Sequence, residues 1–538
     1  MDEHDPLLVD TGRGFSLQYR GRWLYSSRAP LDAPLQTARA LEVQAETLYV
    51  VPSPCLWHGV AELLARLPES SAVLGIESCE DLLNLASRTL PAPSSGAPEG
   101  RLLLSSASEA LTAYRTLESS IAPARFRRVV EVRLSGGRAL SPGVYDSTIA
   151  ALDADIAIQY RNRLAMVRMG RLWTRNVIAN LASMRWSDVS PLPTYDRPLV
   201  VCGAGPSLDN ALPLLHTYRD ALTIMAVDTA AGALARAGIY PDLVVCLEAQ
   251  IYNVADFLPL GHGRTRLVAD LSSHPSSFRA TDGPITLLSS QWYQSAFLTR
   301  LHGAGLPLTS VPPLGSVGVL ALHVARMMGS PIIISGLDFA FSPGATHCSG
   351  SPVDLLERRL ESRTHKRTAA WAASYRTHTR RIDNGCLADP ALAMYAALAT
   401  SELAGHPAYD LREGYGARLP ALPLDRAGLE RLLVEGNGRN HIRSNLQGGA
   451  QQSDAAEYRR IAIDFLQAEL ERAKDVALAL RRGCPEPSLK AKLAEADFLY
   501  AHFPDPERVA ALEHDALLRV SAEAAYWRGR LETAIGRA

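Results

Sequence analysis

Short runs of strand-forming residues alternate with segments of helical period along much of the chain. Near the N-terminus, "ETLYVVP" and "SAVLGIE" read as strands, whereas "WHGVAELLARL" and "CEDLLNLASRTL" repeat apolar residues every three or four positions. The alternation resumes farther on with "LVVC", "ALTIMAVDTA" and "PDLVVCLE" as strands. Strands that alternate with helices favour parallel sheets, so we predict an α/β protein with two such regions.

Two changes of pattern divide the chain. Residues 144–186 are mostly helical in pattern, and "DVSPLPTYDRP" at residues 188–198 reads as a linker. Beyond about residue 425 the chain consists of Ala/Leu/Arg/Glu segments of helical period, and its 538 residues exceed what one core sustains. We predict an N-terminal α/β domain with a helical end over residues 1–187, a central Rossmann-like domain over residues 188–424 and a helical C-terminal region over residues 425–538.

Composition excludes several classes of partner. With 55 Lys and Arg against 56 Asp and Glu, the net charge is −1, which gives no global attraction for nucleic acid. The seven cysteines are scattered without C-x-x-C pairs or metal-ligand spacing, as is typical of buried thiols in a reducing compartment. The N-terminus lacks a signal-peptide pattern, and no apolar run reaches about 18 residues. We therefore expect a cytoplasmic protein without membrane insertion and without a bound metal.

The stretch "LVVCGAGPSLDNA" at residues 199–211 predicts a strand, a glycine turn and the start of a helix. At such a junction backbone N–H groups come close to an anion, and the helix dipole adds roughly half a positive charge. Leu208 replaces the third glycine of the dinucleotide fingerprint G-x-G-x-x-G, so the turn indicates phosphate more firmly than NAD. The predicted phosphate-binding residues are Gly203, Ala204, Gly205, Pro206 and Ser207.

Polar residues follow the later predicted strands, where open α/β sheets bind ligands. Asp228 lies roughly 20 residues beyond the glycine turn, the spacing of a ribose-binding acid, although it also fits a strand-end cap. Glu248 fits either a ribose hydroxyl or a loop amide. Gly315 and Ser316 form a second glycine turn before a helix, suited to an anion or a sugar carboxylate or to simple capping. Asp338 follows another strand and completes the set of candidate binding residues.

Two histidines are candidate general bases, because imidazole accepts a proton near neutral pH. His347 lies in the polar loop after Asp338, and His378 precedes two arginines in "SYRTHTRR". Each position also fits a solvated side chain. The Arg-rich residues 357–381 either attract an anionic substrate or form an exposed helix face. Aromatic residues are too sparse there for base stacking, so no nucleic-acid partner is expected.

Several of these stretches resemble one known family, the motility accessory factor (Maf) family, whose central domain is shared with the archaeal pterin diphosphokinases and is called MptE-like. The resemblance is carried by "VVCGAGPSLDNALPLL", "TIMAVDTAAGALARAGIYPDLVVCLE", "GSVGVLALHVARMMGSPIIISGLDFAFSPGATHCSG" and "YDLREGYGARLPALP". The N-terminal "RWLYSSRAPLDAPLQTARAL" is also similar to the start of that family. The resemblance covers roughly residues 15–423 and implies a central domain between an α/β domain and a helical domain. Members of the family are implicated in glycosylating flagellin with nonulosonic acids.

A second likeness, to bacterial sialyltransferases that use CMP-sugars, implies roles within the site. "GAGPSL" is similar to their phosphate-side glycine turn, and "GLDFAF" to the strand-end motif near their sugar site. Ala204 and Asp228 stand where those enzymes place asparagines that contact the nucleotide. Their catalytic base is a later histidine, to which His378 corresponds, whereas His347 matches the "TH" loop of the Maf family itself.

The resemblance implies that a Ser or Thr hydroxyl of flagellin attacks the anomeric carbon of a CMP-activated nonulosonic acid, with no cofactor required. The glycine turn would cradle the phosphate, Asp228 and Glu248 would contact the nucleoside, and Gly315 and Ser316 would face the sugar. Two alternatives stay open. One is an ATP-dependent pterin diphosphokinase, which requires Mg²⁺. The other is a flagellin-binding export factor without catalysis, which acts through its C-terminal helices.

Overall fold

The computed structural model of the chain describes all residues except 1–4, 92–99, 122–124, 196, 262, 293–294, 330, 365, 367–378, 383 and 438–451. Two compact units emerge. The N-terminal unit comprises Met1–Arg168 and His502–Val520, and the central unit comprises Met169–Ala501 and Ser521–Ala538. Two helices, α5 (Pro142–Ser183) and α18 (His514–Ile535), contribute residues to both units.

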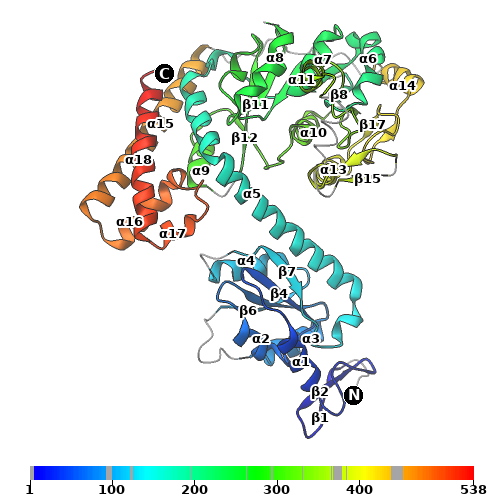
Figure 1. Cartoon of the computed structure of the whole chain (residues 1–538), viewed down its shortest axis with the longest axis vertical. Helices are drawn as coiled ribbons and strands as arrows, with labels where there is room; N and C mark the ends of the chain where they lie inside the picture. The colour runs from blue at the N-terminus through cyan, green and yellow to red at the C-terminus, as the bar shows by residue number, and fades with distance from the viewer. Residues whose placement is uncertain are drawn as a thin grey trace. The chain divides into compact units, whose positions relative to one another are not determined.

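A four-stranded parallel sheet forms the core of the N-terminal unit (Figure 1). In the order β6-β5-β4-β7, its strands are β4 (Thr47–Pro52), β5 (Ala72–Glu77), β6 (Leu102–Ser106) and β7 (Arg128–Glu131). The helices that cover its two faces are α1 (Asp32–Ala40), α2 (Val60–Arg66), α3 (Glu80–Arg88), α4 (Ala110–Ser120) and the first part of α5. Because both faces are covered, β4 and β5 are buried along their whole length. The α/β alternation predicted for this region is confirmed.

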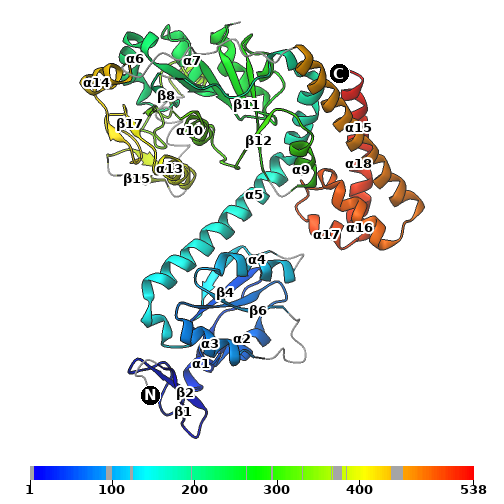
Figure 2. The same cartoon turned by 180° about the vertical axis from the view of Figure 1, so that it is seen from behind.

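A small antiparallel sheet precedes the parallel one (Figure 2). It consists of β1 (Leu7–Asp10), β2 (Phe15–Tyr19) and β3 (Arg22–Trp23), with β2 in the middle. Leu17 and Tyr19 are buried in one cluster with Leu82 of α3. The Tyr19 hydroxyl also donates to the Asp81 carboxylate over 3.0 Å, so one face of the small sheet is attached to α3.

The central unit contains a nine-stranded sheet in which every neighbouring pair is parallel. The strand order is β13-β12-β11-β10-β9-β8-β14-β17-β18. Its strands are β8 (Leu199–Cys202), β9 (Thr223–Val227), β10 (Leu243–Cys246), β11 (Arg266–Asp270), β12 (Ile285–Ser290), β13 (Leu308–Val311), β14 (Ile332–Ser335), β17 (Ala408–Asp410) and β18 (Leu422–Pro423). This arrangement confirms the predicted Rossmann-like class, with β8 at the point where the strand order reverses direction.

Helices cover the nine-stranded sheet. Among the described residues they include α6 (Leu208–Thr217), α7 (Asp228–Arg236), α8 (Val254–Phe257), α9 (Ala296–Gly303), α10 (Val317–Met328), α11 (Pro352–Leu360), α13 (Pro390–Leu403) and α14 (Arg426–Asn437). α10 packs against β8, β9 and β10, and most of its residues are buried, which explains why its sequence is largely apolar.

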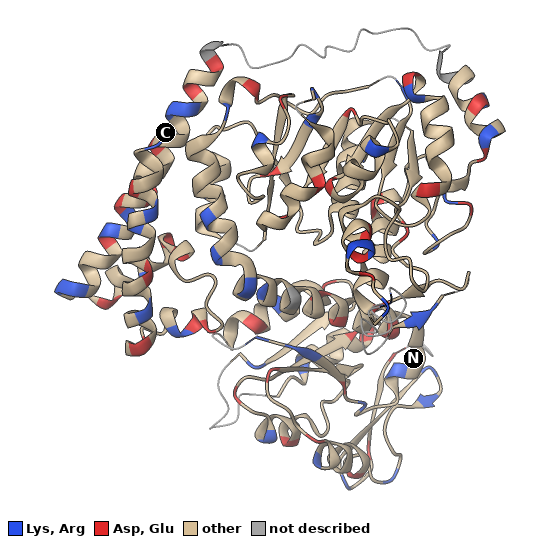
Figure 3. Ribbon diagram, turned by 45° about the horizontal axis from the view of Figure 1, so that its top comes forward, with Lys and Arg blue, Asp and Glu red and all other residues tan. Residues whose placement is uncertain are grey.

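The C-terminal part of the chain is helical, as predicted. It contains α15 (Gln452–Arg482), α16 (Glu486–Glu495), α17 (Pro506–Ala510) and α18. Acidic and basic residues are interspersed along the C-terminal helices, as the red and blue segments of the ribbon in Figure 3 show. None of the helices built from described residues is both long and apolar enough to cross a bilayer.

Helix α9 joins the nine-stranded sheet to the C-terminal helices within the central unit. Arg300 of α9 donates twice, over 2.7 Å each, to the fully buried carboxylate of Glu469 in α15. Asp497 accepts hydrogen bonds from the backbone N–H groups of Ala296 and Phe297 at the start of α9. Phe297 also packs against Phe465 and Phe498. A capped helix end, an ion pair and an aromatic cluster therefore hold these elements together.

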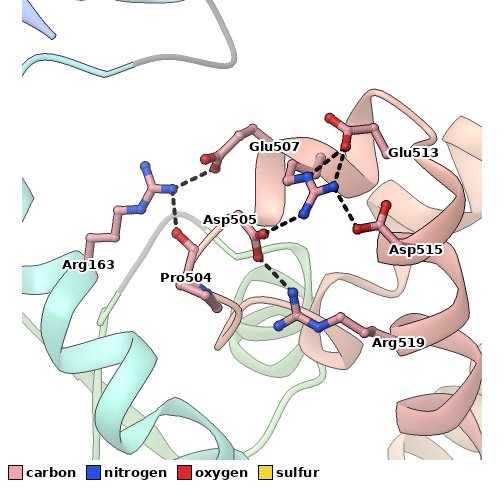
Figure 4. A network of polar contacts seen from close by, with 8 residues as sticks. Arg163, Pro504, Asp505, Glu507, Glu513, Asp515 and Arg519 are labelled. Atoms are coloured by element: carbon pink, nitrogen blue, oxygen red, sulfur yellow. Dashed lines mark hydrogen bonds and ion pairs between the residues drawn. The ribbon is translucent and has the colours of Figure 1, made fainter. Parts of the chain in front are cut away.

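In the N-terminal unit, polar contacts fix the segment from the C-terminal part of the chain (Figure 4). Arg163 of α5 donates to the Pro504 carbonyl oxygen at 2.9 Å and to the Glu507 carboxylate at 2.6 Å. Asp505 accepts hydrogen bonds from Arg508 and Arg519. The charged partners are partly exposed, so each ion pair alone contributes little to stability. Their contribution comes from the network that the pairs form together.

The first residues of the proline-rich segment, Val189 to Pro191, pack against the sheet of the central unit. Val189 bridges to Ile285 and is almost fully buried, and Ser190 N–H donates to the Ile285 carbonyl oxygen at 2.8 Å. The buried guanidinium of Arg266 donates to Ser190 Oγ at 2.6 Å. The prolines disfavour an α-helix in this segment, but its first residues still pack against the nine-stranded sheet. The two predicted boundaries between the three domains stay predictions.

Candidate functional site

The strand order places a topological switch point between β8 and β14. From β8 the chain runs outward through β9 to β13, and α10 then returns it to β14 on the other side of β8. Open α/β sheets bind ligands beyond the carboxyl ends of the strands at such a point. The glycine turn at residues 203–207 follows β8, and residues 336–338 follow β14, so the predicted site elements come together here.

The glycine turn is closed by the segment that follows β14. Gly203 N–H donates to the Ser335 carbonyl oxygen and Gly205 N–H to the Gly336 carbonyl oxygen, each over 2.8 Å. A Cβ atom on Gly203 would lie 2.4 Å from the Gly336 oxygen, and one on Gly205 would lie 2.3 Å from Asp338 Oδ2. Close approach of the protein's own chain therefore requires these glycines, a reason that differs from the phosphate contact expected from the sequence.

Asp338 is an internal anion at the start of α6. Its carboxylate accepts hydrogen bonds from Ser207 N–H at 2.9 Å and from the Ser207 hydroxyl. Burial raises the pKa of Asp338 to about 6, although the bonds from Ser207 and the nearby Arg412 guanidinium act in the opposite direction. Three of the turn's polar hydrogens expected to face a phosphate, on Gly203, Gly205 and Ser207, thus have acceptors within the protein.

Arg412 fixes the loops around Asp338, and sequence reasoning missed it. Its buried guanidinium donates to both carboxylate oxygens of Asp410 at 3.0 and 2.8 Å. It also donates to the carbonyl oxygens of Leu337 at 2.8 Å and Ala417 at 3.0 Å. Arg412 lies within "YDLREGYGARLPALP", but its contacts join segments 75 residues apart, so no local pattern indicated them.

The loop that carries His347 lies against the glycine turn. Cys348 N–H donates to the Ala204 carbonyl oxygen at 2.8 Å, and Ser349 N–H donates to the Asp209 carboxylate. His347 Nδ1 lies 3.1 Å from Thr346 Oγ1. Burial lowers the pKa of the His347 imidazole below its ordinary value, although Glu357 and Asp354 act in the opposite direction. The imidazole is therefore neutral at pH 7 and able to accept a proton.

The predicted base His378 lies outside the described residues. Its role stays a prediction.

Asp228 begins α7 and belongs to an acidic group beyond β9 and β10. Its carboxylate accepts from Thr229 N–H at 2.8 Å and from Asn253 Nδ2 at 2.9 Å. Burial raises the pKa of Asp228 to about 6. The pKa of Asp256 is raised to about 7, mainly by burial and to a smaller extent by the negative charges of Asp228 and Glu248. Glu248 itself is exposed and accepts a bond from a neighbouring amide.

Gly315 and Ser316 precede α10, and Ser316 is its N-cap residue without a side-chain cap. The structure brings this second turn close to the first through Leu337. A Cβ atom on Gly203 would lie 2.7 Å from Leu337 Cδ2, and one on Gly318 in the first turn of α10 would lie 3.0 Å from the same atom. The starts of α6 and α10 therefore flank Leu337, one closed by Asp338 and the other without a capping side chain.

Two asparagines of α5 hold the neighbouring strand ends in place. Asn176 Nδ2 donates to the carbonyl oxygens of Ala249 and Ser272, each over 2.9 Å. Asn180 Nδ2 donates to those of Leu271 and Ser273 over 2.8 and 2.9 Å. Both asparagines are almost fully buried. Their spacing of four residues places them on one helix face, a pattern that is visible in "RNVIANL" but was not used in the sequence analysis.

Comparison with known proteins agrees with this architecture. Residues 175–344 match the family described as 6-hydroxymethylpterin diphosphokinase MptE-like. An uncharacterized protein of Treponema pallidum (strain Nichols) is 29% identical over 541 residues, covering 96% of this chain and 93% of the relative. A second uncharacterized protein of that organism is 30% identical over 103 residues, 19% of this chain and 46% of the relative.

A solved structure extends the likeness to the whole chain. The MAf glycosyltransferase from Magnetospirillum magneticum AMB-1 aligns with a TM-score of 0.52 and 13% identity, covering 99% of this chain and 91% of that one. At this identity the match establishes the fold. The resemblance expected from the sequence is confirmed at the level of domain and fold: the chain carries an MptE-like domain and has the fold of a Maf glycosyltransferase.

Proposed function

We propose that the chain is a glycosyltransferase that moves a nonulosonic sugar from a CMP donor to Ser or Thr of flagellin. The observation that carries the proposal is the meeting of three elements at the switch point of the sheet. These are the glycine turn, the Asp338 carboxylate and the His347 loop; the turn lies more than 100 residues before the other two in the sequence. The fold shared with a Maf glycosyltransferase supports the reaction class.

The donor's negative charge faces the start of α10 in this proposal. The start of α6 already holds the Asp338 carboxylate, so a phosphate there would meet a like charge unless Asp338 were protonated or displaced. The start of α10 has no capping side chain and presents the positive end of a helix dipole. Asp228, with Glu248 nearby, offers acceptor oxygens for the hydroxyl or amino groups of the nucleoside.

His347 is the proposed general base. The Thr346 hydroxyl lies 3.5 Å from Glu357 Oε1. If the hydroxyl donates to Glu357, Thr346 Oγ1 accepts a hydrogen bond from His347 Nδ1–H. His347 Nε2 then carries no hydrogen and can take a proton. In the reaction the acceptor oxygen bonds to the anomeric carbon and its proton passes to Nε2. The bond from the anomeric carbon to the phosphate oxygen breaks, and CMP leaves with the electron pair.

Calorimetric titration with CMP, CTP, ATP and NAD⁺, each with and without Mg²⁺, tests the proposal. We expect CMP to bind without Mg²⁺ and to lose binding in Ala204→Asp, which places a carboxylate in the turn beside the donor. Ala404→Asp is the matched control, because Ala404 is exposed and lies between α13 and β17 on the amino-end side of the sheet. Absence of CMP binding to the wild-type protein would contradict the proposal.

The family match favours one second candidate, an ATP-dependent pterin diphosphokinase. That activity predicts tighter binding of ATP than of CMP and a requirement for Mg²⁺. The same titrations separate the two enzymes. No nucleotide binding at all would favour a flagellin-binding factor without catalysis.

A further inference from the structure

One half-buried arginine of the central unit has no acceptor for its hydrogen bonds. Arg175 of α5 forms no hydrogen bond or ion pair with another described residue. Every other buried or half-buried arginine side chain that the structure describes has at least one such partner. On the same helix, even the exposed Arg171 pairs with Glu523 at 3.0 Å. A guanidinium that is partly removed from water needs acceptors, so the position of Arg175 indicates an acceptor from outside the chain.

Arg175 lies at the edge of the sheet where ligands bind. The next residue, Asn176, donates to the Ala249 and Ser272 carbonyl oxygens in the loops that follow β10 and β11. These loops leave the carboxyl ends of the two strands, and open α/β sheets bind ligands at that edge. The hydrogen bonds of Asn176 therefore hold the helix turn that carries Arg175 beside these loops.

The loop after β11 supplies a second hydrogen-bond donor, His274. Its Nδ1 accepts a hydrogen bond from Ser276 N–H at 3.2 Å, so the hydrogen of the neutral imidazole is on Nε2. The side chain is half-buried, and Nε2 has no acceptor among the described residues. Burial lowers the pKa of His274, and the nearby charge of Arg175 lowers it further. The imidazole is therefore neutral at pH 7 and presents Nε2–H in the neighbourhood of Arg175.

The acid of the neighbouring loop does not neutralise Arg175. Glu248 is exposed in the loop after β10, and its backbone oxygen accepts from His274 N–H at 3.0 Å. Its carboxylate accepts instead from Gln250 N–H at 2.9 Å, and its charge raises the pKa of Asp228. Glu248 therefore belongs to the acidic group beyond β9, and the two donors stay without an anion.

We propose that Arg175 and His274 form a binding site for an oxyanion, the phosphate or carboxylate group of a small ligand. The planar guanidinium can donate two parallel hydrogen bonds to such a group, and His274 Nε2–H can donate a third. The site lies beside the ends of β10 and β11, whereas the glycine turn and Asp338 lie at the ends of β8 and β14. It does not depend on the nucleotide chemistry proposed above.

NMR of the full chain with isotope-labelled histidine tests the proposal, with inorganic phosphate and succinate as probes at constant ionic strength. We expect at least one probe to shift the ring signal of His274 until it saturates. The bound anion should also raise the pKa of His274, because it stabilises the imidazolium. The probe that binds more tightly identifies the group that the ligand carries. His274→Gln lacks the signal and so assigns it.

Arg175→Met should weaken this binding at least about tenfold, because it removes charge-assisted hydrogen bonds. Without any probe, Arg175→Met should also raise the pKa of His274, since a positive charge beside the imidazole is lost. Arg264→Met is the matched control. It removes an exposed arginine just before β11, at the opposite edge of the sheet, and should leave both the binding and the pKa unchanged.

Three results would overturn the proposal. The first is the absence of saturable binding of both probes to the wild-type protein. The second is binding that Arg175→Met leaves unchanged, or that Arg175→Met and Arg264→Met weaken equally. The third is an unchanged pKa of His274 in Arg175→Met, which would contradict the closeness of the two side chains. Thermal unfolding verifies that the variants are folded.

Discussion

Replacement of Asp338 by Asn should remove a specific pH dependence from the stability of the chain. The carboxylate is almost fully buried against Ser207, and burial raises its pKa from 3.8 to about 6. Because the folded-state pKa lies above the unfolded one, the folded chain holds the proton more tightly. The stabilisation is complete below about pH 4 and is lost as the pH rises through about 6.

The expected size follows from these two pKa values. At pH 5 proton binding to Asp338 favours the folded state by about 1.4 kcal/mol, and at pH 8 by close to zero. The wild-type protein should therefore lose about 1.4 kcal/mol more than Asp338→Asn between those two pH values. Asn keeps the shape and an acceptor oxygen for Ser207 N–H but does not titrate.

Urea unfolding at pH 5 and pH 8, followed by far-ultraviolet circular dichroism, measures this difference. Asp228 and Asp256 also have raised pKa values, so only the comparison of wild type with variant isolates Asp338. Asp220→Asn, at an exposed aspartate, is the control and should behave as the wild type does. Equal pH dependence in the wild type and Asp338→Asn would refute the raised pKa of Asp338 that its burial causes.

Three further predictions follow from the packing of the central unit. Gly205→Ala should destabilise the fold by roughly 1–3 kcal/mol in urea unfolding, because the new Cβ atom would overlap the Asp338 carboxylate. The control Gly529→Ala, in open space on α18, should stabilise the fold by roughly 0.5–1 kcal/mol. Equal effects of the two substitutions would contradict the close approach of Gly205 to Asp338. Glu469→Gln should lower the midpoint of thermal unfolding. Loss of the charge partner of a buried ion pair costs roughly 3–5 kcal/mol, and the cost is somewhat smaller here because Arg300 is partly exposed. An unchanged midpoint would show that the ion pair between Arg300 and Glu469 does not stabilise the fold. His347→Ala should reduce transferase kcat by roughly 10²–10⁴, because the variant lacks the base. Burial lowers the pKa of His347, so the wild-type rate should begin to fall at a lower pH than it would with an imidazole of ordinary pKa. Retained kcat in the variant would exclude His347 as the base.

The sequence predicted the local structure at the switch point but not its long-range partners. The strand-forming residues and the two glycines predicted the strand, the turn and the start of the helix that β8 and α6 form. The contact that these glycines make within the protein was not predicted, because Gly205 faces Asp338, 133 positions later in the chain. A local sequence pattern indicates that a small residue is needed at a position, but it does not identify the distant atom that approaches this position.

The residues missed by sequence reasoning share one property, which is that their partners are distant in sequence. Asn176 donates to backbone oxygens 73 and 96 residues away, and Arg412 donates to the Leu337 carbonyl oxygen 75 residues before it. Every residue has a backbone carbonyl oxygen, so the residue type does not show which of these oxygens accepts a side-chain hydrogen bond. The nine-stranded order was likewise not predictable from the strands alone, because crossing from β13 back to β14 depends on how α10 packs.

The most direct test of the proposed transferase is the intact mass of flagellin after incubation with the purified protein and a CMP-activated nonulosonic acid. The account predicts a mass increase by whole sugar residues, release of CMP, and neither change with His347→Ala. No mass increase with wild-type protein that is folded and binds CMP would contradict the claim that this site transfers the sugar to flagellin.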